Sequence, residues 1–260
     1  MKVLVTGLRG TVGRALEAHL LAGGHQVIGW DRAAVPIDRY DAMDRFVAET
    51  APDAVVNLAI ASRPTGRERE SWLVNHDLPS ELAWICRQRA LRFVHASTVM
   101  VFSPSATGPF TIESAPDADH GYGHEKRMAE ARVFYQYPRA TVVRLGWQIG
   151  DAAGSNNMID YLEQQAREHG HVAASTRFRP ACSFLPDTAA ALARALEAPP
   201  GLYQVDGNER HTLFEIARAL SARHGERWRI VESAEPAQDQ RMIDPRLAVA
   251  PLAGRLPALA

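Results

Sequence analysis

Three glycines directly after a short apolar run constrain the fold of this chain more than any other feature. Residues 2–6 are typical of a buried parallel strand, and Gly7, Gly10 and Gly13 follow at three-residue spacing. An amphipathic segment through Leu21 then predicts a helix. Glycines at such a junction allow a tight turn and a close approach of the backbone to a pyrophosphate. The order of strand, turn and helix predicts a dinucleotide-binding turn; a purely structural turn is the alternative.

The first 150 residues alternate between apolar runs and helical stretches. Strands are predicted at 2–6, 26–30, 53–59, 91–96 and 140–145, with helices at 14–21, 41–49, 71–89 and 122–135. Pro79 is expected to kink or break the helix over 71–89. The alternation predicts an α/β fold with a doubly wound (Rossmann), mostly parallel sheet over residues 1–150.

The composition shifts after Gly150, and residues 151–260 predict a small mixed substrate-binding lobe, partly interleaved with the first part. Helices are expected there at 158–168, 186–197 and 212–224, and short strands at 202–205 and 228–231. The tail from Ala234 is rich in proline and loosely patterned.

An acidic residue follows the second predicted strand, about 20 residues beyond the glycine turn. This residue, Asp31, is placed to accept hydrogen bonds from an adenine ribose, which favours NAD. Arg9 inside the turn and Arg32 beside Asp31 instead suit a ribose 2′-phosphate. The set favours NADP(H) over NAD(H), with solvated surface arginines as the alternative. Asp38, before the next helix, is placed to meet the adenine.

Tyr122 and Lys126 lie four residues apart, so on a helix they project from one face. Lys2 and Lys126 are the only lysines among 29 basic residues, which indicates that position 126 needs a compact ammonium group. A lysine beside a phenol is expected to lower the tyrosine pKa, which would make Tyr122 a usable proton donor near neutral pH. A Tyr and Lys in contact on a helix surface is the alternative.

Composition narrows the classes of partner. The formal net charge is −1 and the sequence pI about 6.8, so neither nucleic acid nor an anionic membrane is expected as a partner. Cys86 and Cys182 lack metal or redox spacing, and His120 and His124 lack a Glu or Cys at ligand spacing. We therefore expect no metal site and a reducing cytoplasmic location. No apolar run is long enough to span a bilayer, so no membrane span is expected either. The oligomeric state, including a homodimer, stays open.

These motifs resemble the extended short-chain dehydrogenase/reductase family of the NAD-dependent epimerase/dehydratase type, and within it the dTDP-4-dehydrorhamnose reductase type. The resemblance rests on Thr6 to Gly13, Asp31, Asn57-Leu-Ala59, Ser97-Thr98-x-x-Val101-Phe102, Tyr122-x-x-x-Lys126 and Arg144-Leu-Gly-Trp147. It implies a carbonyl reductase in which Tyr122 is the general acid, Lys126 holds the nicotinamide ribose and Thr98 orients the carbonyl oxygen. Ser97, next to Thr98, is the alternative hydroxyl.

The glycine turn and the resemblance together give a set of expected cofactor contacts: Gly7, Arg9, Gly10, Thr11, Val12, Gly13, Asp31, Arg32, Asp38, Leu58, Ala59, Ala61, Asn75, Tyr122 and Lys126. Expected substrate contacts are Ser97, Val99, Arg177 and Arg179, the two arginines as a clamp on a diphosphate. The implied substrate is a small carbonyl compound, a nucleotide-linked 4-keto-sugar.

Two residues depart from the family pattern. Val99 and Met100 stand where the similar reductases carry Asp-Tyr and the sugar dehydratases carry Asp-Glu. Two apolar side chains cannot serve as acid and base, so dehydration is disfavoured. An epimerase that retains bound NAD and a non-catalytic cofactor-binding regulatory subunit remain as alternative functions.

Overall fold

The computed structural model describes residues 1–62, 65–153 and 156–260. They form two compact units, and each takes up segments from the other half of the chain. The first unit contains Met1–Ser103, Ala115–Arg144 and Leu192–Tyr203, and the second contains Pro104–Ser114, Leu145–Ala191 and Gln204–Ala260. Residues 104–114 and 145–150 thus cluster with the C-terminal half, and residues 192–203 cluster with the N-terminal half.

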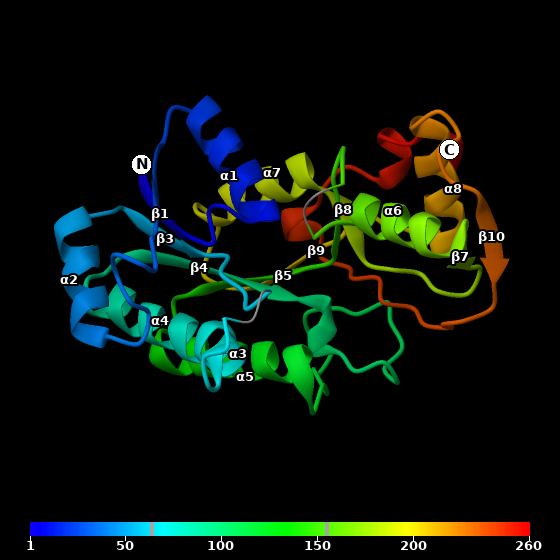
Figure 1. The fold of residues 1–260 in the computed structure, drawn as a ribbon. Coiled ribbons are helices and arrows are strands. Elements are labelled where there is room, and N and C mark those ends of the chain that lie inside the picture. Colours follow the sequence, from blue (N-terminus) through cyan, green and yellow to red (C-terminus); the bar gives the residue numbers. More distant parts are fainter. Residues whose placement is uncertain (63–64, 154–155) are drawn as a thin grey trace. The chain divides into compact units, whose positions relative to one another are not determined.

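A six-stranded sheet forms the centre of the first unit (Figure 1). Its strands are β1 (Lys2–Thr6), β2 (Gln26–Gly29), β3 (Ala54–Asn57), β4 (Arg92–Thr98), β5 (Thr141–Leu145) and β9 (Gly201–Val205). They follow the order β2-β1-β3-β4-β5-β9, and β1 pairs in parallel with both β2 and β3. The order reverses between β1 and β3, the point at which open α/β sheets bind ligands. This arrangement confirms the predicted doubly wound, mostly parallel sheet.

Helices cover the sheet because its strands are apolar on both sides. Every residue of β3 is buried, as are Val3, Leu4 and Val5 of β1. In Figure 1, α4 (Leu78–Gln88) and α5 (Gly121–Gln136) lie together on one face, and α1 (Thr11–Ala22) lies on the other. The helix α2 (Tyr40–Thr50) contributes Met43 and Val47 to the core on the side of α4.

The predicted helix over 71–89 is three consecutive pieces. A short α3 (Glu70–Trp72) leads into a π-helical turn (Leu73–Asp77), and α4 follows. Pro79 lies in the first turn of α4, directly after the π-helical turn. The backbone stays in the right-handed helical region through Asp77 and Leu78, so the proline coincides with a widened turn and not with a break.

The second unit contains two separate two-stranded parallel sheets. β6 (Trp147–Ile149) pairs with β8 (Cys182–Phe184), and β7 (Val172–Ser175) pairs with β10 (Ile230–Ser233). The helices α6 (Met158–His169) and α8 (Leu213–Arg223) pack against them around a second core. The other elements are α7 (Leu185–Ala195) and 3-10 helices at Pro245–Leu247, Leu252–Gly254 and Pro257–Leu259. Strands β6, β7 and β8 were not predicted.

Candidate functional site

The glycine turn after β1 has space for backbone only. Gly7 has a φ of +70°, and a Cβ there would lie 2.8 Å from the backbone of Leu58 and Ala59. A Cβ on Gly13 would lie 2.3 Å from the Gly7 carbonyl oxygen. The turn is closed by a 2.9 Å hydrogen bond from the Gly10 N–H to that same oxygen. Non-glycine residues at positions 7 and 13 would therefore push the turn away from β3.

The N-terminus of α1 opens directly from this turn. Gly10 is the N-cap, and no side chain caps the helix. The first N–H groups of a helix lack intrahelical acceptors and carry the positive end of the helix dipole. A glycine turn beneath a helix start that no side chain caps has the shape and charge that suit a pyrophosphate. The backbone of this turn and of the helix start therefore fits the pyrophosphate of a dinucleotide, as predicted for Gly7, Gly10, Thr11, Val12 and Gly13.

The segment opposite the turn is held by two side chains from within the unit. Thr6 Oγ1 accepts hydrogen bonds from the N–H groups of Leu58 and Ala59, both at 3.2 Å. Asn75, in the π-helical turn, accepts from the Ala61 N–H at 3.1 Å. Its amide in turn donates to Glu125 of α5 at 2.8 Å. Hydrogen bonds thus fix the predicted residues Leu58, Ala59, Ala61 and Asn75 in one segment beside the glycine turn.

The residues predicted for the adenine ribose lie at exposed positions, and most have partners. Asp31 accepts from the Ala33 N–H at 3.0 Å, which leaves its carboxylate in a local turn. Arg32 lies 3.8 Å from Glu70, with its side chain 52% exposed. Asp38 binds Arg67 at 2.6 Å, and this hydrogen bond lowers the Asp38 pKa. Arg9 is exposed, and its carbonyl accepts from Arg14.

Thr98 ends β4, and Tyr122 and Lys126 lie in the first two turns of α5. Thr98 caps a 3-10 helix, Val99–Val101, by accepting from the Met100 N–H at 3.2 Å. The first turn of α5 lies directly on that helix, because a Cβ on Gly123 would come within 2.0 Å of the Met100 carbonyl. Lys126 Nζ donates to the Ala96 carbonyl at 2.7 Å. The lysine is therefore bonded to the strand that ends in Thr98.

Burial determines the ionisation of the two motif residues. Burial, and to a smaller extent Glu125, raises the pKa of Tyr122. Burial lowers the pKa of Lys126 to about 7, against a smaller opposing effect of Glu130. The expectation that Lys126 lowers the Tyr122 pKa is thus wrong for this structure. The ammonium group is directed at the backbone of β4, and removal from water outweighs the effect of the lysine charge on the phenol.

Ser97 belongs to a buried ionic cluster. Its hydroxyl donates to Glu130 at 2.5 Å, and Arg144 donates to both oxygens of Glu130 at 3.0 and 2.7 Å. The Arg144 guanidinium also lies over the Phe102 ring at 5.0 Å from its centroid. Because the Ser97 proton is committed to Glu130, its hydroxyl has no proton to donate elsewhere. Thr98 accepts a hydrogen bond and keeps its own proton free to donate.

Sequence reasoning missed the residues behind the motif. His95 is fully buried, with Nδ1 at 2.9 Å from Asn57 Nδ2 and Nε2 at 3.1 Å from Lys126 Nζ. Glu130 and Arg144 form the ion pair described above. A signal existed in the sequence, since His95 and Arg144 each lie near the carboxyl end of a predicted buried strand, directly after two apolar residues. A polar residue inside such a strand needs a buried partner.

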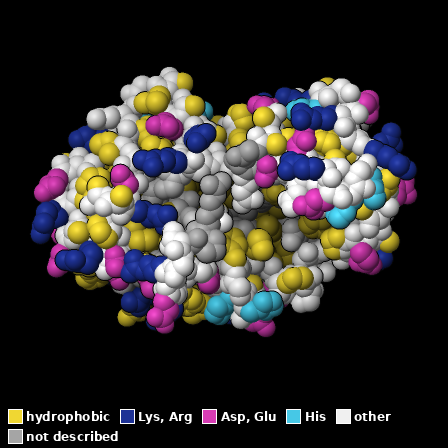
Figure 2. Space-filling view, in the orientation of Figure 1, with side chains coloured by type: hydrophobic (Ala, Val, Ile, Leu, Met, Phe, Trp, Pro, Cys, Tyr) yellow, Lys and Arg dark blue, Asp and Glu magenta, His cyan; other side chains and the backbone are white. Residues whose placement is uncertain are grey.

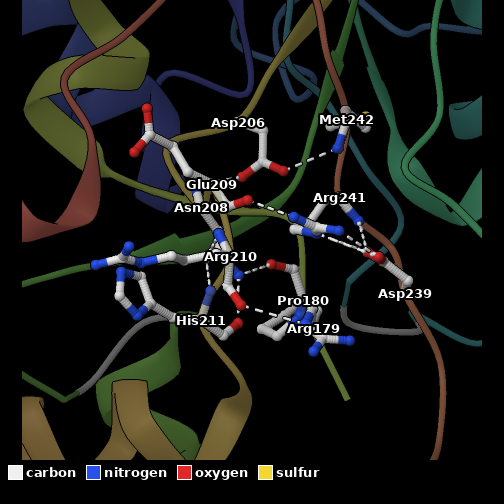
Figure 3. Close-up of polar contacts among 10 residues, drawn as sticks. All are labelled: Arg179, Pro180, Asp206, Asn208, Glu209, Arg210, His211, Asp239, Arg241 and Met242. Atoms are coloured by element: carbon white, nitrogen blue, oxygen red, sulfur yellow. Dashed lines mark hydrogen bonds and ion pairs between the residues drawn. The ribbon is translucent and has the colours of Figure 1, made fainter. Parts of the chain in front are cut away.

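The two arginines predicted as a diphosphate clamp lie in the second unit. Arg177 is 3.8 Å from Glu235, and Arg179 Nε donates to the Arg210 carbonyl at 3.2 Å. Figure 3 shows Arg179 beside the loop that contains Arg210. In the same loops Asp206 accepts from backbone N–H groups, among them those of Asn208 and Met242. Each arginine therefore has its own protein partner.

Charges on the surface are mixed. Arginines and acidic side chains are interspersed over the face of the molecule in Figure 2. Within the described ranges, His, Cys, Asp and Glu side chains form no group that could hold a metal ion. No helix in the described part of the chain has the length and apolar character needed to cross a membrane.

The chain is similar to known proteins in both sequence and fold. The family model described as "RmlD substrate binding domain" matches residues 1–249. A dTDP-4-dehydrorhamnose reductase from Burkholderia thailandensis is 29% identical over 99% of this chain and 89% of its own length. The spore coat polysaccharide biosynthesis protein SpsK of Bacillus subtilis is 26% identical over 86% of this chain and 80% of its own. The solved dTDP-4-dehydrorhamnose reductase of Bacillus anthracis, in complex with NADP, has a TM-score of 0.84 at 16% identity, with coverage of 98% of this chain and 97% of that one.

Proposed function

This chain belongs to the RmlD substrate-binding domain family, and on that premise we propose that it reduces the keto group of a nucleotide-linked 4-keto-sugar with NADPH. One observation carries the proposal: Lys126 is bonded to the backbone of β4 two residues before Thr98, and Tyr122 lies one turn earlier on the same helix. We infer that the Thr98 hydroxyl, the Tyr122 phenol and the Lys126 amine act together at this end of β4, the sheet edge where α/β enzymes place their chemistry.

The residues of the chain have separable roles in this reaction. The chemistry that a bound nicotinamide dinucleotide supplies is hydride transfer. Tyr122 donates its phenolic proton to the carbonyl oxygen of the substrate, and its raised pKa keeps that proton in place at neutral pH. Thr98 donates a hydrogen bond to the same oxygen and so stabilises the negative charge that develops there. Lys126 binds the nicotinamide ribose and, when protonated, stabilises the phenolate.

The preference for NADPH rests on the exposed guanidiniums. Arg9 lies in the glycine turn and Arg32 directly follows Asp31; both are exposed, and a 2′-phosphate would give each a charge-assisted partner. The ion pair between Arg32 and Glu70 is long, at 3.8 Å, and its Arg32 side chain is 52% exposed, so Arg32 can exchange this partner at little cost in free energy. The dinucleotide-binding part is residues 1–150 and the substrate part residues 151–260, where Arg177 and Arg179 would bind the diphosphate.

The apolar pair after Thr98 narrows the reaction. Val99 is 5% exposed and Met100 is 50% exposed, and neither apolar side chain can act as an acid or a base. Elimination of water from a sugar needs such a pair. Reduction needs only the acid, the orienting hydroxyl and the hydride, and these requirements are met without residues 99 and 100.

The test is turnover by Tyr122→Phe, which keeps the ring and removes the hydroxyl. With NADPH and dTDP-4-dehydrorhamnose the rate should fall by about 10²–10⁴, the range of general acid catalysis, while NADPH binding survives. Tyr135→Phe is the matched control on the same helix, because Tyr135 is 74% exposed and should tolerate the change. Equal rates for Tyr122→Phe and wild type would refute the proposal and favour a non-catalytic subunit. Tightly bound NAD with no net redox change would indicate an epimerase.

A further inference from the structure

A chain of buried hydrogen bonds runs from the glycine turn to Lys126. Its first member is Thr6, which is 2% exposed. Thr6 Oγ1 already accepts two N–H groups, from Leu58 and Ala59, and a hydroxyl oxygen has two lone pairs. Its own proton must therefore go to the remaining neighbour, Asn57 Oδ1, at 2.6 Å. This bond fixes which end of the Asn57 amide is the oxygen.

The orientation of the Asn57 amide fixes the tautomer of His95. With Oδ1 on Thr6, the Asn57 NH₂ group faces His95 Nδ1 at 2.9 Å and donates to it. A ring nitrogen that accepts carries no proton, so the neutral imidazole holds its proton on Nε2. Burial lowers the pKa of His95, which keeps the ring neutral. The histidine therefore presents an N–H donor on its far side.

That donor points at Lys126. His95 Nε2 lies 3.1 Å from Lys126 Nζ, and Lys126 is 1% exposed. An ammonium group has three donors and no lone pair, so it cannot accept from an N–H. A neutral amine has one lone pair, and it can accept from His95 while it donates to the Ala96 carbonyl at 2.7 Å.

The other charged groups around Lys126 do not offset this contact. Glu130, one turn further along α5, favours the ammonium form, but Arg144 from β5 binds both of its oxygens. Glu125 on the same helix accepts from Ser71 and Asn75, and Tyr122 is neutral because burial raises its pKa. From β4, His95 itself faces the amine.

We propose that His95 is a positioning residue: held as the Nε2–H tautomer by Thr6 and Asn57, it donates to Lys126 Nζ and disfavours the ammonium form of that lysine. Accommodating an ammonium by hydrogen bonding would require the chain to reverse. His95 would move its proton to Nδ1, Asn57 would flip, and Thr6 would then face three donors with two lone pairs. The reversal would weaken the hydrogen bonds that Thr6 Oγ1 accepts from the N–H groups of Leu58 and Ala59. The backbone segment beside the glycine turn and the charge of Lys126 are therefore coupled.

The proposal is tested by NMR, which needs no turnover. Because Lys2 and Lys126 are the only lysines, a protein labelled with ¹³C at lysine Cε gives two side-chain signals, assigned with Lys2→Arg. Lys126 should titrate near pH 7 in the wild type. Asn57→Asp replaces the NH₂ donor by an acceptor, so His95 should shift its proton to Nδ1. His95→Gln can turn a carbonyl towards Lys126 without adding charge.

Both variants should raise the Lys126 midpoint by at least about one pH unit, a tenfold change in the proton equilibrium. His169→Gln, at an exposed position of the second unit, should leave it unchanged. In the wild type, ¹⁵N-histidine spectra should show His95 protonated at Nε2, a readout that does not depend on the variants folding. A wild-type Lys126 midpoint near 10.5, a proton on His95 Nδ1, or an unmoved midpoint in His95→Gln would overturn the proposal.

A second readout rests on the proposed function. If Lys126 stabilises the phenolate in its protonated form, the reduction rate should fall as pH rises through the Lys126 midpoint, and His95→Gln should move that limb upwards by the shift measured by NMR. A failure of the reductase assignment removes this rate profile but leaves the NMR titrations intact. If the positioning role of His95 is wrong, the enzyme still turns over, but His95→Gln shifts neither the NMR midpoint of Lys126 nor the pH dependence of the rate.

Discussion

Replacing Glu130 by Gln should destabilise the first unit far more than removing an exposed carboxylate. Glu130 is 6% exposed, and it receives Arg144 through two hydrogen bonds and Ser97 through one. Gln keeps the shape but loses the charge, and its NH₂ group faces a donor. The Arg144 guanidinium, 2% exposed and with Nη1 already lacking a partner, would then be buried without a counter-charge.

The expected loss follows from that burial. Removing one partner of a buried pair costs about 3–5 kcal/mol, because the other charge stays buried and unpaired. For a chain of this size each kcal/mol corresponds to roughly 2–4 °C, so Tm should fall by roughly 6–20 °C. The assay is urea and thermal unfolding followed by far-UV circular dichroism. Asp44→Asn is the matched control, since Asp44 binds Arg89 with both side chains about one-third exposed, and it should cost about 0–1 kcal/mol.

A double variant separates the ion pair from simple packing. Glu130→Met with Arg144→Met removes both charges and fills the space with flexible apolar side chains. Such replacements of buried pairs are often neutral or stabilising, so the double variant should recover most of the loss. If Glu130→Gln were no less stable than Asp44→Asn, the cluster would contribute nothing and this reasoning would be refuted.

Three further changes test the account. Gly13→Ala should lower the free energy of unfolding by about 1–3 kcal/mol and weaken dinucleotide binding, because its Cβ would press on the Gly7 carbonyl. In Gly254→Ala the added Cβ meets open space, so calorimetry with NADPH should show unchanged binding. Arg9→Ala with Arg32→Ala should weaken NADPH binding and leave NADH binding unchanged, and equal effects on both would remove the preference for the 2′-phosphate. Lys126→Met tests the pH dependence of stability. The folded-state pKa of Lys126 is depressed to about 7 from 10.5, so between these values the unfolded chain binds more protons and stability rises with pH. From pH 7 to pH 9 the free energy of unfolding of the wild type should rise by about 2 kcal/mol relative to that of Lys126→Met. If urea unfolding gave the same pH dependence for both proteins, the depressed pKa of the buried amine would be contradicted.

The sequence was sufficient for features that are encoded by short spacings. The glycine turn and the alternation of strands and helices predict the parallel sheet, and the structure confirms it. The three strands β6, β7 and β8 have only three or four residues each, too few for a periodic pattern. Pro79 was placed inside a helix because the wide π-helical turn before it leaves no mark in the pattern of apolar residues.

The candidate site could be predicted as a set of residues but not as a network. Tyr122 and Lys126 are found from their spacing, yet the direction of the Tyr122 pKa shift was wrong, because it depends on burial and on where the amine points. The adjacent hydroxyls of Ser97 and Thr98 are equivalent in sequence, and only the contact with Glu130 distinguishes them. Thr6, Asn57 and His95 come from three strands, so their hydrogen bonds depend on sheet order and register.

The most direct test of the central claim is the fate of the transferred hydrogen. Wild-type protein is incubated with NADPH that carries deuterium at C4 of the nicotinamide, together with dTDP-4-dehydrorhamnose, and the sugar product is examined by NMR and mass spectrometry. We expect one deuterium on the former carbonyl carbon of the sugar, formed in step with loss of absorbance at 340 nm, and its near-complete absence with Tyr122→Phe. A sugar that is converted without deuterium, or NADPH that stays unoxidised in the presence of bound sugar, would contradict the assignment as a reductase.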